Sequence, residues 1–302
     1  MTPTPVTHPA ADLRTLPSAV ERLAPAVVGL SLRRGAASGV VWSSGVVVTA
    51  ASAVWRARQL QVVTADGELV SGTLRGVDPS TDLAAITFDA GSAKAAERAV
   101  EAQPLVGDFV FAVGREPSGR VQASFGHVGA AGGAWRTWRG GQVDRLIRLD
   151  GGLYPGLAGA PVADATGAVI GVASPALSRH HGVVLPVATV DRVLLALLAH
   201  GRVRQGYLGV AAQPVRAMLE GAATEGLLIG SVDDDGPAAC AGLLVGDVIV
   251  SAGGQPVASI EALRERLGAE QVGAPLQLRV ARGGQSIGLT LDVTERPVRG
   301  CH

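Results

Sequence analysis

Lysine, cysteine and aromatic residues are scarce in this chain of 302 residues, and aromatics make up only 3% of it. Lys94 is the only lysine, so a catalytic serine–lysine pair would have to use that one side chain. The two cysteines, Cys240 and Cys301, are too few for a disulfide framework. Acidic and basic residues balance to a formal net charge of +0, which argues against binding nucleic acid through bulk electrostatics.

Long apolar runs are missing as well. No segment approaches the roughly 18 consecutive apolar residues that a membrane-spanning helix needs. The N-terminal stretch MTPTPVTHP lacks the basic start and apolar core of a signal peptide. The sequence as written therefore predicts a cytoplasmic protein without a membrane segment, and an extracytoplasmic location is the alternative if the natural chain is longer. No motif for a cofactor or a metal ion is evident.

The residues that are plentiful indicate a globular, β-rich protein. Hydrophobic residues make up 47% and charged residues 17% of the chain, with 41 glycines and 17 prolines. That mixture is typical of many short strands joined by tight turns. We divide the chain into a flexible Pro-rich tail (1–18), a first domain (19–201), a hinge (202–206), a second domain (207–297) and a tail (298–302).

The pattern of short segments differs between the two domains. In the first, Val-rich segments alternate with Gly, Asp and Ser turns, which predicts a sandwich or barrel whose first strand lies within residues 23–32. Residues 189–200 have helical spacing, and Gly201 follows as a stop signal. In the second, strands are expected near 207–213, 226–232, 246–252, 275–282 and 286–293, and helices near 237–242 and 259–268 with Ser259 as an N-cap.

The first domain contains VTAASAV at 48–54 and GVDPSTDLA at 76–84. These blocks resemble LTNAHVV and GxDPxTDLA of the HtrA/Deg branch of trypsin-like serine proteases. VGDFV with AVG (106–114) matches a further block of the family, and the stretch 150–162, which includes GLAGAP, matches the block that holds its nucleophile. The blocks thus follow the order of base, carboxylate and nucleophile. The resemblance covers most of residues 20–200. It implies a mainly β fold, with a trypsin-like double six-stranded β-barrel followed by an α+β PDZ domain.

The same resemblance implies a degenerate catalytic triad. These proteases need a serine nucleophile, a histidine that takes its proton and a carboxylate that orients the histidine. Ser52 stands at the histidine position, Asp82 at the carboxylate position and Ala158 at the nucleophile position. A hydroxyl titrates too high to act as a base at neutral pH, and a methyl group cannot attack a carbonyl. We interpret Asp82 as a structural residue and Ser52 as a small polar filler, with Ser52 as a relocated nucleophile the alternative.

No histidine stands at the expected position, although His180 and His181 are candidates for the border of the substrate cleft. The oxyanion hole uses backbone amides, and Gly156 and the amide of residue 158 are retained. Leu157 replaces the family's asparagine and Ala160 replaces a glycine. Because a Cβ restricts access to positive φ, we expect these two replacements to oppose the active shape of the loop.

Two motifs of the second domain resemble bacterial PDZ domains. GYLGV (206–210) is similar to their carboxylate-binding loop, and GPAACAGLLVGDVI (236–249) to their SPAAxAGLxxGDxI. The resemblance implies that the C-terminus of a protein or peptide ligand adds as a strand to an open sheet edge. Its carboxylate would lie on the amides of Leu208, Gly209 and Val210, next to Tyr207.

The expected helix 259–268 forms the opposite wall of that groove by the same resemblance. Ile260, Leu263 and Leu267 are spaced i, i+3, i+7 and share one helix face. They either line the peptide groove or pack on the domain's own core, and Leu263 is the one we expect to touch a ligand.

The sequence thus favours a catalytically inactive HtrA-like protein that binds peptides or C-termini through its PDZ domain, in a scaffolding, chaperone-like or regulatory role. The alternative is a serine-type endopeptidase of this family that acts in proteolysis or protein quality control with atypical or weak catalysis. A third hypothesis is a subunit that assembles with an active protease, or a homo-oligomer.

Overall fold

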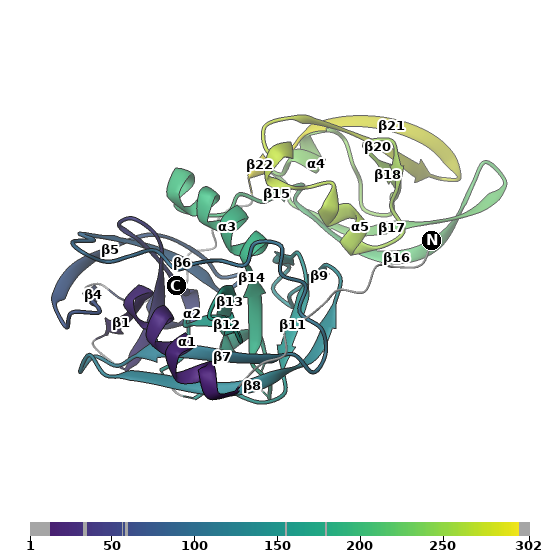
Figure 1. The fold of residues 1–302 in the computed structure, drawn as a ribbon. Helices are drawn as coiled ribbons and strands as arrows, with labels where there is room; N and C mark the ends of the chain where they lie inside the picture. The colour runs from purple at the N-terminus through teal and green to yellow at the C-terminus, as the bar shows by residue number, and fades with distance from the viewer. Residues whose placement is uncertain are drawn as a thin grey trace. The chain divides into compact units, whose positions relative to one another are not determined.

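The structure is a computed structural model that describes residues 13–32, 35–55, 57, 60–154, 156–178 and 180–295. The chain divides into two compact units, Met1–Val203 and Arg204–His302 (Figure 1). Strands dominate both units, as expected for a mainly β protein. No helix within the described ranges is long and apolar enough to cross a membrane.

The first unit begins with a closed barrel of six strands in the order β1-β2-β3-β6-β5-β4. Segments such as VVGLS and VVVTA place β-branched side chains inside it, and Val28, Leu30 and Ile86 are fully buried there. The strands are β1 (Val27–Ser31), β2 (Ala36–Ser43), β3 (Val46–Ala50), β4 (Leu60–Val63), β5 (Leu69–Asp78) and β6 (Leu83–Phe88).

A second closed barrel follows, with the strand order β11-β14-β13-β12-β7-β8. Together the two barrels confirm the expected double six-stranded architecture. A small ribbon of β9 (Trp135–Arg136) and β10 (Gln142–Val143) precedes β11. The barrel strands are β7 (Phe109–Arg115), β8 (Val121–Gly132), β11 (Leu146–Leu149), β12 (Pro161–Asp164), β13 (Val169–Ser174) and β14 (Val183–Pro186).

The first described residues are helical, which corrects the expected extent of the N-terminal tail. A 3₁₀ turn (Leu13–Thr15) leads into α1 (Leu16–Leu23), whereas residues 1–12 lie outside the described part. Leu16, Ala19 and Leu23 share one buried face at helical spacing. The first strand therefore starts at Val27 rather than near residue 23.

The predicted helix at the end of the first domain is present as α3 (Val187–His200). Val190, Val193 and Leu197 are buried in the same core cluster as α1. Gly201 ends the helix with a left-handed φ of 73°, and its amide donates to the Leu197 carbonyl. The stop signal that we inferred from the sequence is confirmed.

The second unit is a sheet flanked by short helices. The N-cap role of Ser259 is confirmed, since its Oγ accepts a hydrogen bond from the Ala262 amide at 3.1 Å. Cys240 is exposed with a free thiol, and Cys301 lies outside the described residues.

The main sheet of this unit has the order β16 (Val210–Leu219), β17 (Ala222–Val232), β18 (Val248–Ala252), β20 (Pro275–Arg282), β21 (Gln285–Asp292), with β19 (Gln255–Pro256) beside β18. The remaining elements are β15 (Gly206–Tyr207), which pairs with β22 (Thr294–Glu295), and the helices α4 (Pro237–Cys240) and α5 (Ile260–Glu265).

Candidate functional site

Asp82 joins the two barrels at the site that the sequence singles out. It lies in the turn before β6 with a left-handed φ of 60°, a conformation that aspartate tolerates better than most residues. Its side chain is buried; Oδ1 accepts a hydrogen bond from the Ser52 amide at 2.7 Å, and Oδ2 accepts one from the Ser174 hydroxyl at 2.5 Å. The carboxylate therefore connects α2 (Ala51–Val54) with the end of β13.

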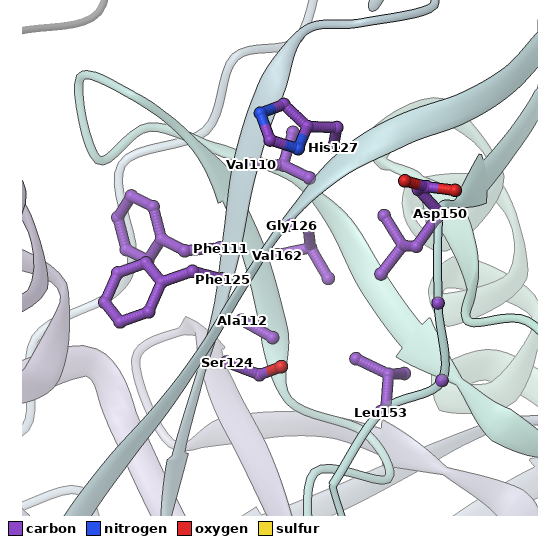
Figure 2. Close-up of a pocket in the computed structure, with 13 residues that line it drawn as sticks. Val110, Phe111, Ala112, Ser124, Phe125, Gly126, His127, Asp150, Leu153 and Val162 are labelled. Atoms are coloured by element: carbon purple, nitrogen blue, oxygen red, sulfur yellow. The ribbon is translucent and has the colours of Figure 1, made fainter. Parts of the chain in front are cut away.

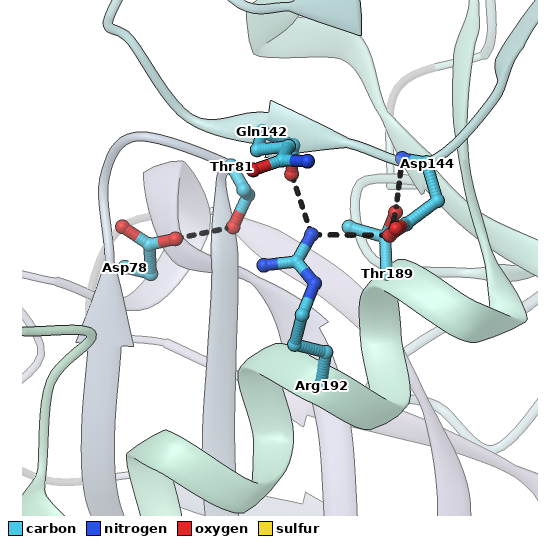
Figure 3. Close-up of polar contacts among 6 residues, drawn as sticks. All are labelled: Asp78, Thr81, Gln142, Asp144, Thr189 and Arg192. Atoms are coloured by element: carbon cyan, nitrogen blue, oxygen red, sulfur yellow. Dashed lines mark hydrogen bonds and ion pairs between the residues drawn. The ribbon is translucent and has the colours of Figure 1, made fainter. Parts of the chain in front are cut away.

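A second aspartate fixes the turn that carries Asp82. Oδ1 of Asp78 accepts hydrogen bonds from the amide and the hydroxyl of Ser80, at 3.0 and 2.6 Å. Its Oδ2 accepts one from the Thr81 hydroxyl at 2.6 Å (Figure 3). The Thr137 hydroxyl donates to the Ser80 carbonyl at 2.6 Å. The polar residues of the GVDPSTDLA motif thus hold Asp82 in place.

A further polar cluster ties α3 to the ribbon that packs near this turn (Figure 3). Asp144 Oδ2 accepts from the Thr189 hydroxyl at 2.6 Å and from Arg192 at 3.0 Å. Arg192 also donates to the Gln142 carbonyl at 2.8 Å. Because the Arg192 and Asp144 side chains are partly exposed, this cluster fixes position more than it adds stability.

Ser52 has an exposed side chain in the first turn of α2, and its amide, not its hydroxyl, contacts Asp82. Within the described residues, no histidine side chain hydrogen bonds to Asp82 or to Ser52. His180 and His181 are exposed, and His127 packs edge-on against the Phe109 ring. None of the histidines that the structure describes is therefore in place to act as a base beside Ser52.

The loop around Ala158 accommodates both of its unusual neighbours. Gly156 and Gly159 take the left-handed conformations, with φ of 90° and 78°. In the described part of the chain, the non-glycine residues with positive φ are Asp82 and Glu220, so Leu157 and Ala160 need no such conformation. Both are fully buried in the second barrel. In the loop as it lies here, neither Cβ meets a left-handed backbone conformation.

The same loop keeps backbone donors available. Across the described ranges, the amides of Gly156 and Ala158 have no hydrogen-bond acceptor, whereas the Gly159 amide donates to the Ala173 carbonyl at 2.9 Å. Gly159 lies against the end of β3: a Cβ on it would be 2.2 Å from Thr49 Oγ1 and 2.5 Å from the Ala50 nitrogen. The loop and the start of α2 are thus neighbours in space.

Two buried serines in this site were missed at the sequence level. Ser174 supports Asp82, and Ser38 supports the loop: its amide donates to the Ala158 carbonyl at 3.1 Å and its hydroxyl to the Gly156 carbonyl at 2.8 Å. The signal that could have revealed them is a hydroxyl inside an otherwise apolar strand, in AASGVVWS and VIGVAS.

A cavity of about 270 Å³ opens between the β7–β8 hairpin and residues 149–153 (Figure 2). Ser124, His127 and Asp150 line it, but Figure 2 shows Ser124 well apart from the other two. No hydrogen bond joins these three side chains in the described structure, and neither Ser52 nor Ala158 lines the cavity. The cavity therefore offers no alternative nucleophile–base pair.

In the second unit, the structure brings the two PDZ-like motifs together. Gly209 has a left-handed φ of 77°, and a Cβ on it would lie 3.2 Å from the Cα of Gly236. The Leu208 carbonyl accepts from the Ala238 amide at 3.0 Å, and the Tyr207 hydroxyl donates to the Asp233 carboxylate. These contacts shape the loop that leads into Val210 at the start of β16.

Helix α5 lies against β16 and contributes to the same core cluster as Leu208. Leu263 is buried in that cluster, whereas Ile260 and Leu267 are partly exposed at its margin. Of these three side chains, Leu263 packs on the domain's own core.

Comparison with known proteins agrees with this arrangement. The trypsin-like peptidase domain family matches residues 37–172, and the PDZ domain family matches residues 206–293. The HtrA-type protease AlgW, solved with a decapeptide, superposes with a TM-score of 0.79 and 25% identity, covering 94% of this chain and 99% of that chain. The chain belongs to the HtrA family.

Curated relatives of this HtrA-family chain are named as probable periplasmic serine endoproteases, DegP-like. The one from Chlamydia trachomatis is 30% identical over 267 residues, 85% of this chain and 53% of the relative. The one from Brucella suis is 32% identical over 269 residues, 85% of this chain and 52% of the relative. A solved serine endoprotease from Yersinia pestis has a TM-score of 0.79 at 26% identity, covering 98% of this chain and all of that chain. The chain spans about half the length of the curated relatives.

Proposed function

We propose that this HtrA-family chain is inactive as a protease and binds peptides or protein C-termini through its PDZ domain. One observation carries the proposal: within the described residues, the Asp82 carboxylate accepts hydrogen bonds from the Ser52 amide and the Ser174 hydroxyl but from no imidazole, which a working triad needs. In this proposal Ser52, Asp82 and Ala158 occupy the positions of base, carboxylate and nucleophile, and Gly156 belongs to the oxyanion loop.

The loss of rate expected without a catalytic serine and histidine is large enough to support inactivity. In subtilisin, loss of the serine or the histidine lowers kcat by about 10⁶-fold, roughly 8 kcal/mol of barrier. What remains in such variants is ~10³- to 10⁴-fold over the uncatalysed reaction in water, supplied by the oxyanion hole and substrate binding. The available amides at Gly156 and Ala158 supply at most this remainder.

The proposed ligand is an extended peptide with a free carboxylate. It would add to the open edge of β16, with its carboxylate on the loop formed by Tyr207, Leu208, Gly209 and Val210 and with α5 as the opposite wall. AlgW, solved with a decapeptide, is a precedent for peptide binding by a related protein. Ile260 and Leu267, partly exposed, would contact the ligand more readily than Leu263.

Location and assembly follow as part of the same proposal. The names of the relatives favour an extracytoplasmic location over the cytoplasmic one that the sequence as written predicts. A chain that binds peptides without cutting them would act as a scaffold, a chaperone-like binder or a regulator. It would do so alone, as a homo-oligomer, or in assembly with an active protease.

A second candidate function is serine-type endopeptidase activity in proteolysis or protein quality control with atypical catalysis, which the names of the relatives favour. A fluorophosphonate probe, which reacts only with an activated serine, separates the two. We expect no labelling and no hydrolysis of unfolded casein. Casein hydrolysis that is lost in Ser52→Ala would overturn the proposed inactivity, whereas hydrolysis that persists in that variant points to a contaminating protease.

Peptide binding is tested on an array of synthetic peptides, each present with a free and with an amidated C-terminus. We expect selective binding that disappears on amidation, because amidation removes the carboxylate and leaves every other ligand contact. Gly209→Glu is the protein control, since it adds bulk and negative charge to the loop. An array without selective binders would refute the binding half of the proposal.

A further inference from the structure

The edge strand β16 contains a proline, Pro214, which interrupts the row of backbone donors on the side that a peptide would approach. Within the described residues β16 pairs with β17 and with no other strand, so its second edge is open. Every β16 residue from Val210 to Leu219 pairs with β17, and the one register shift, between Ala211 and Ala212, leaves Gly230 of β17 as the extra residue. Pro214 lies in the middle of this run, opposite Leu227.

Two observations determine which β16 residues face the open edge. The Asp233 amide donates to the Gly209 carbonyl at 2.8 Å, so the ladder towards β17 uses Gly209 and then every second residue. Pro214 has no N–H to give to that ladder, and proline within sheets places its nitrogen on the open side. Both observations assign the backbone groups of Val210, Ala212 and Pro214 to the open edge.

We propose that Pro214 ends strand addition, so that this PDZ domain pairs only with the backbone of the last three residues of a C-terminal peptide. This inference rests on the proposed peptide binding and specifies its extent. In an antiparallel pair, the amide of the last ligand residue donates to the Val210 carbonyl. The third residue from the end exchanges two hydrogen bonds with Ala212, and the fifth would face Pro214.

At Pro214 the ligand loses a donor and meets an obstacle. The proline nitrogen carries a ring carbon in place of the hydrogen that a ladder bond requires. The ring is exposed, so nothing on the domain draws it away from the approaching strand. Residues beyond the fourth from the C-terminus would therefore leave the sheet edge, and their identity would matter little.

N-methylation of single ligand amides tests this directly. The probe is the decapeptide with a free carboxylate that binds tightest on the array, with fluorescence anisotropy against the full chain as the readout. Methylation at the third residue from the end is expected to weaken binding by about tenfold, in line with the loss of a backbone hydrogen bond and added bulk. Methylation at the fifth is expected to change Kd by less than twofold.

Pro214→Val restores the N–H on an edge where valine suits the strand, so the domain should remain folded. In this variant, methylation at the fifth residue should weaken binding by about three- to tenfold. Gln213→Val is the matched control: Gln213 is exposed but directs its backbone to β17, so the wild-type pattern should persist. A fifth-residue effect of fivefold or more in the wild type, or no new effect in Pro214→Val, would overturn the inference. Failure of every peptide to bind would instead overturn the proposed function on which it rests.

Discussion

The Ser174 hydroxyl donates a hydrogen bond of 2.5 Å to Oδ2 of Asp82, and both side chains are buried. With the Ser52 amide on Oδ1, each carboxylate oxygen has a partner from a different element. Among the described residues, the hydrogen-bond partners of this carboxylate are a backbone amide and a hydroxyl, and no imidazole is one of them. Contacts of the fold thus hold the aspartate in place.

Removal of the Ser174 hydroxyl is expected to destabilise the first unit. In Ser174→Ala one oxygen of a buried carboxylate loses its partner, which costs about 1–3 kcal/mol of the free energy of unfolding. Urea unfolding followed by tryptophan fluorescence measures the loss. Ser52→Ala is the matched control and should stay within about 0.5 kcal/mol, because Asp82 bonds to the Ser52 amide and not to its hydroxyl. Equal losses in both variants would contradict this assignment.

Restoring the two missing side chains is expected to restore reactivity. The double variant Ser52→His, Ala158→Ser supplies an imidazole next to Asp82 and a hydroxyl on the loop in which Leu157 and Ala160 are already accommodated. We expect the fluorophosphonate probe to label the double variant and to leave each single variant unlabelled, since serine and histidine act as a unit. A folded double variant that stays unlabelled would argue that the buried Leu157 or Ala160 has altered the loop.

The Asp247–Arg282 pair in the second unit predicts a pH dependence. Burial raises the pKa of Asp247, but hydrogen bonds from Arg282 and the Leu244 amide outweigh it and hold the pKa below its ordinary value. A lowered pKa in the folded state gives stability that is present above the unfolded value of about 3.9 and is lost as the pH falls through the folded value.

Asp247→Asn should therefore lower the stability of this unit by about 2 kcal/mol at pH 7, and the difference should shrink below about pH 4. The measurement is hydrogen exchange in the full chain from pH 3 to 7, followed on residues 204–295 for Asp247→Asn and on the described residues of the first unit for the comparison variant. Glu116→Gln is the comparison: Arg120 likewise lowers the pKa of Glu116, but that pair is at the surface, so no comparable change is expected. A constant gap at all pH values would contradict the prediction.

Arg115 is a buried cation that holds main-chain carbonyls. Its guanidinium donates to the carbonyls of Val27, Gly119 and Ala24, each at 2.8 Å. Arg115→Met is expected to destabilise the first unit by about 2 kcal/mol, because these acceptors lose a charged donor. Arg115→Lys should recover little, since one ammonium group cannot reproduce the planar fork. Full recovery by lysine in urea unfolding would show that the charge alone suffices.

The sequence allowed the architecture to be predicted because motif order and turn residues are local. The α3 helix with its Gly201 stop and the Ser259 cap followed from such patterns, whereas the double barrel was implied by the resemblance to HtrA/Deg proteases. The helical start at Leu16 was missed because its apolar stripe spans only two turns. Which residues of the 156–160 loop take positive φ was also not evident in the sequence: Gly156 and Gly159 do so, whereas Leu157 and Ala160 do not.

The supporting serines could not be predicted for a related reason. Ser38 is 118 residues from Gly156 and Ser174 is 92 residues from Asp82. A hydroxyl in an apolar strand gives no indication of such a distant partner. The direction of the β16 backbone was also invisible in the sequence, because it depends on the register with β17.

Pro214 has a consequence for the protein in solution as well. An open, ten-residue edge strand is a template on which copies of the same chain can pair and aggregate. If Pro214 ends strand addition as we propose, its ring would block a neighbouring β16 equally, and the edge would receive short C-termini but reject long strands. We then expect Pro214→Val to precipitate at a lower protein concentration than the wild type.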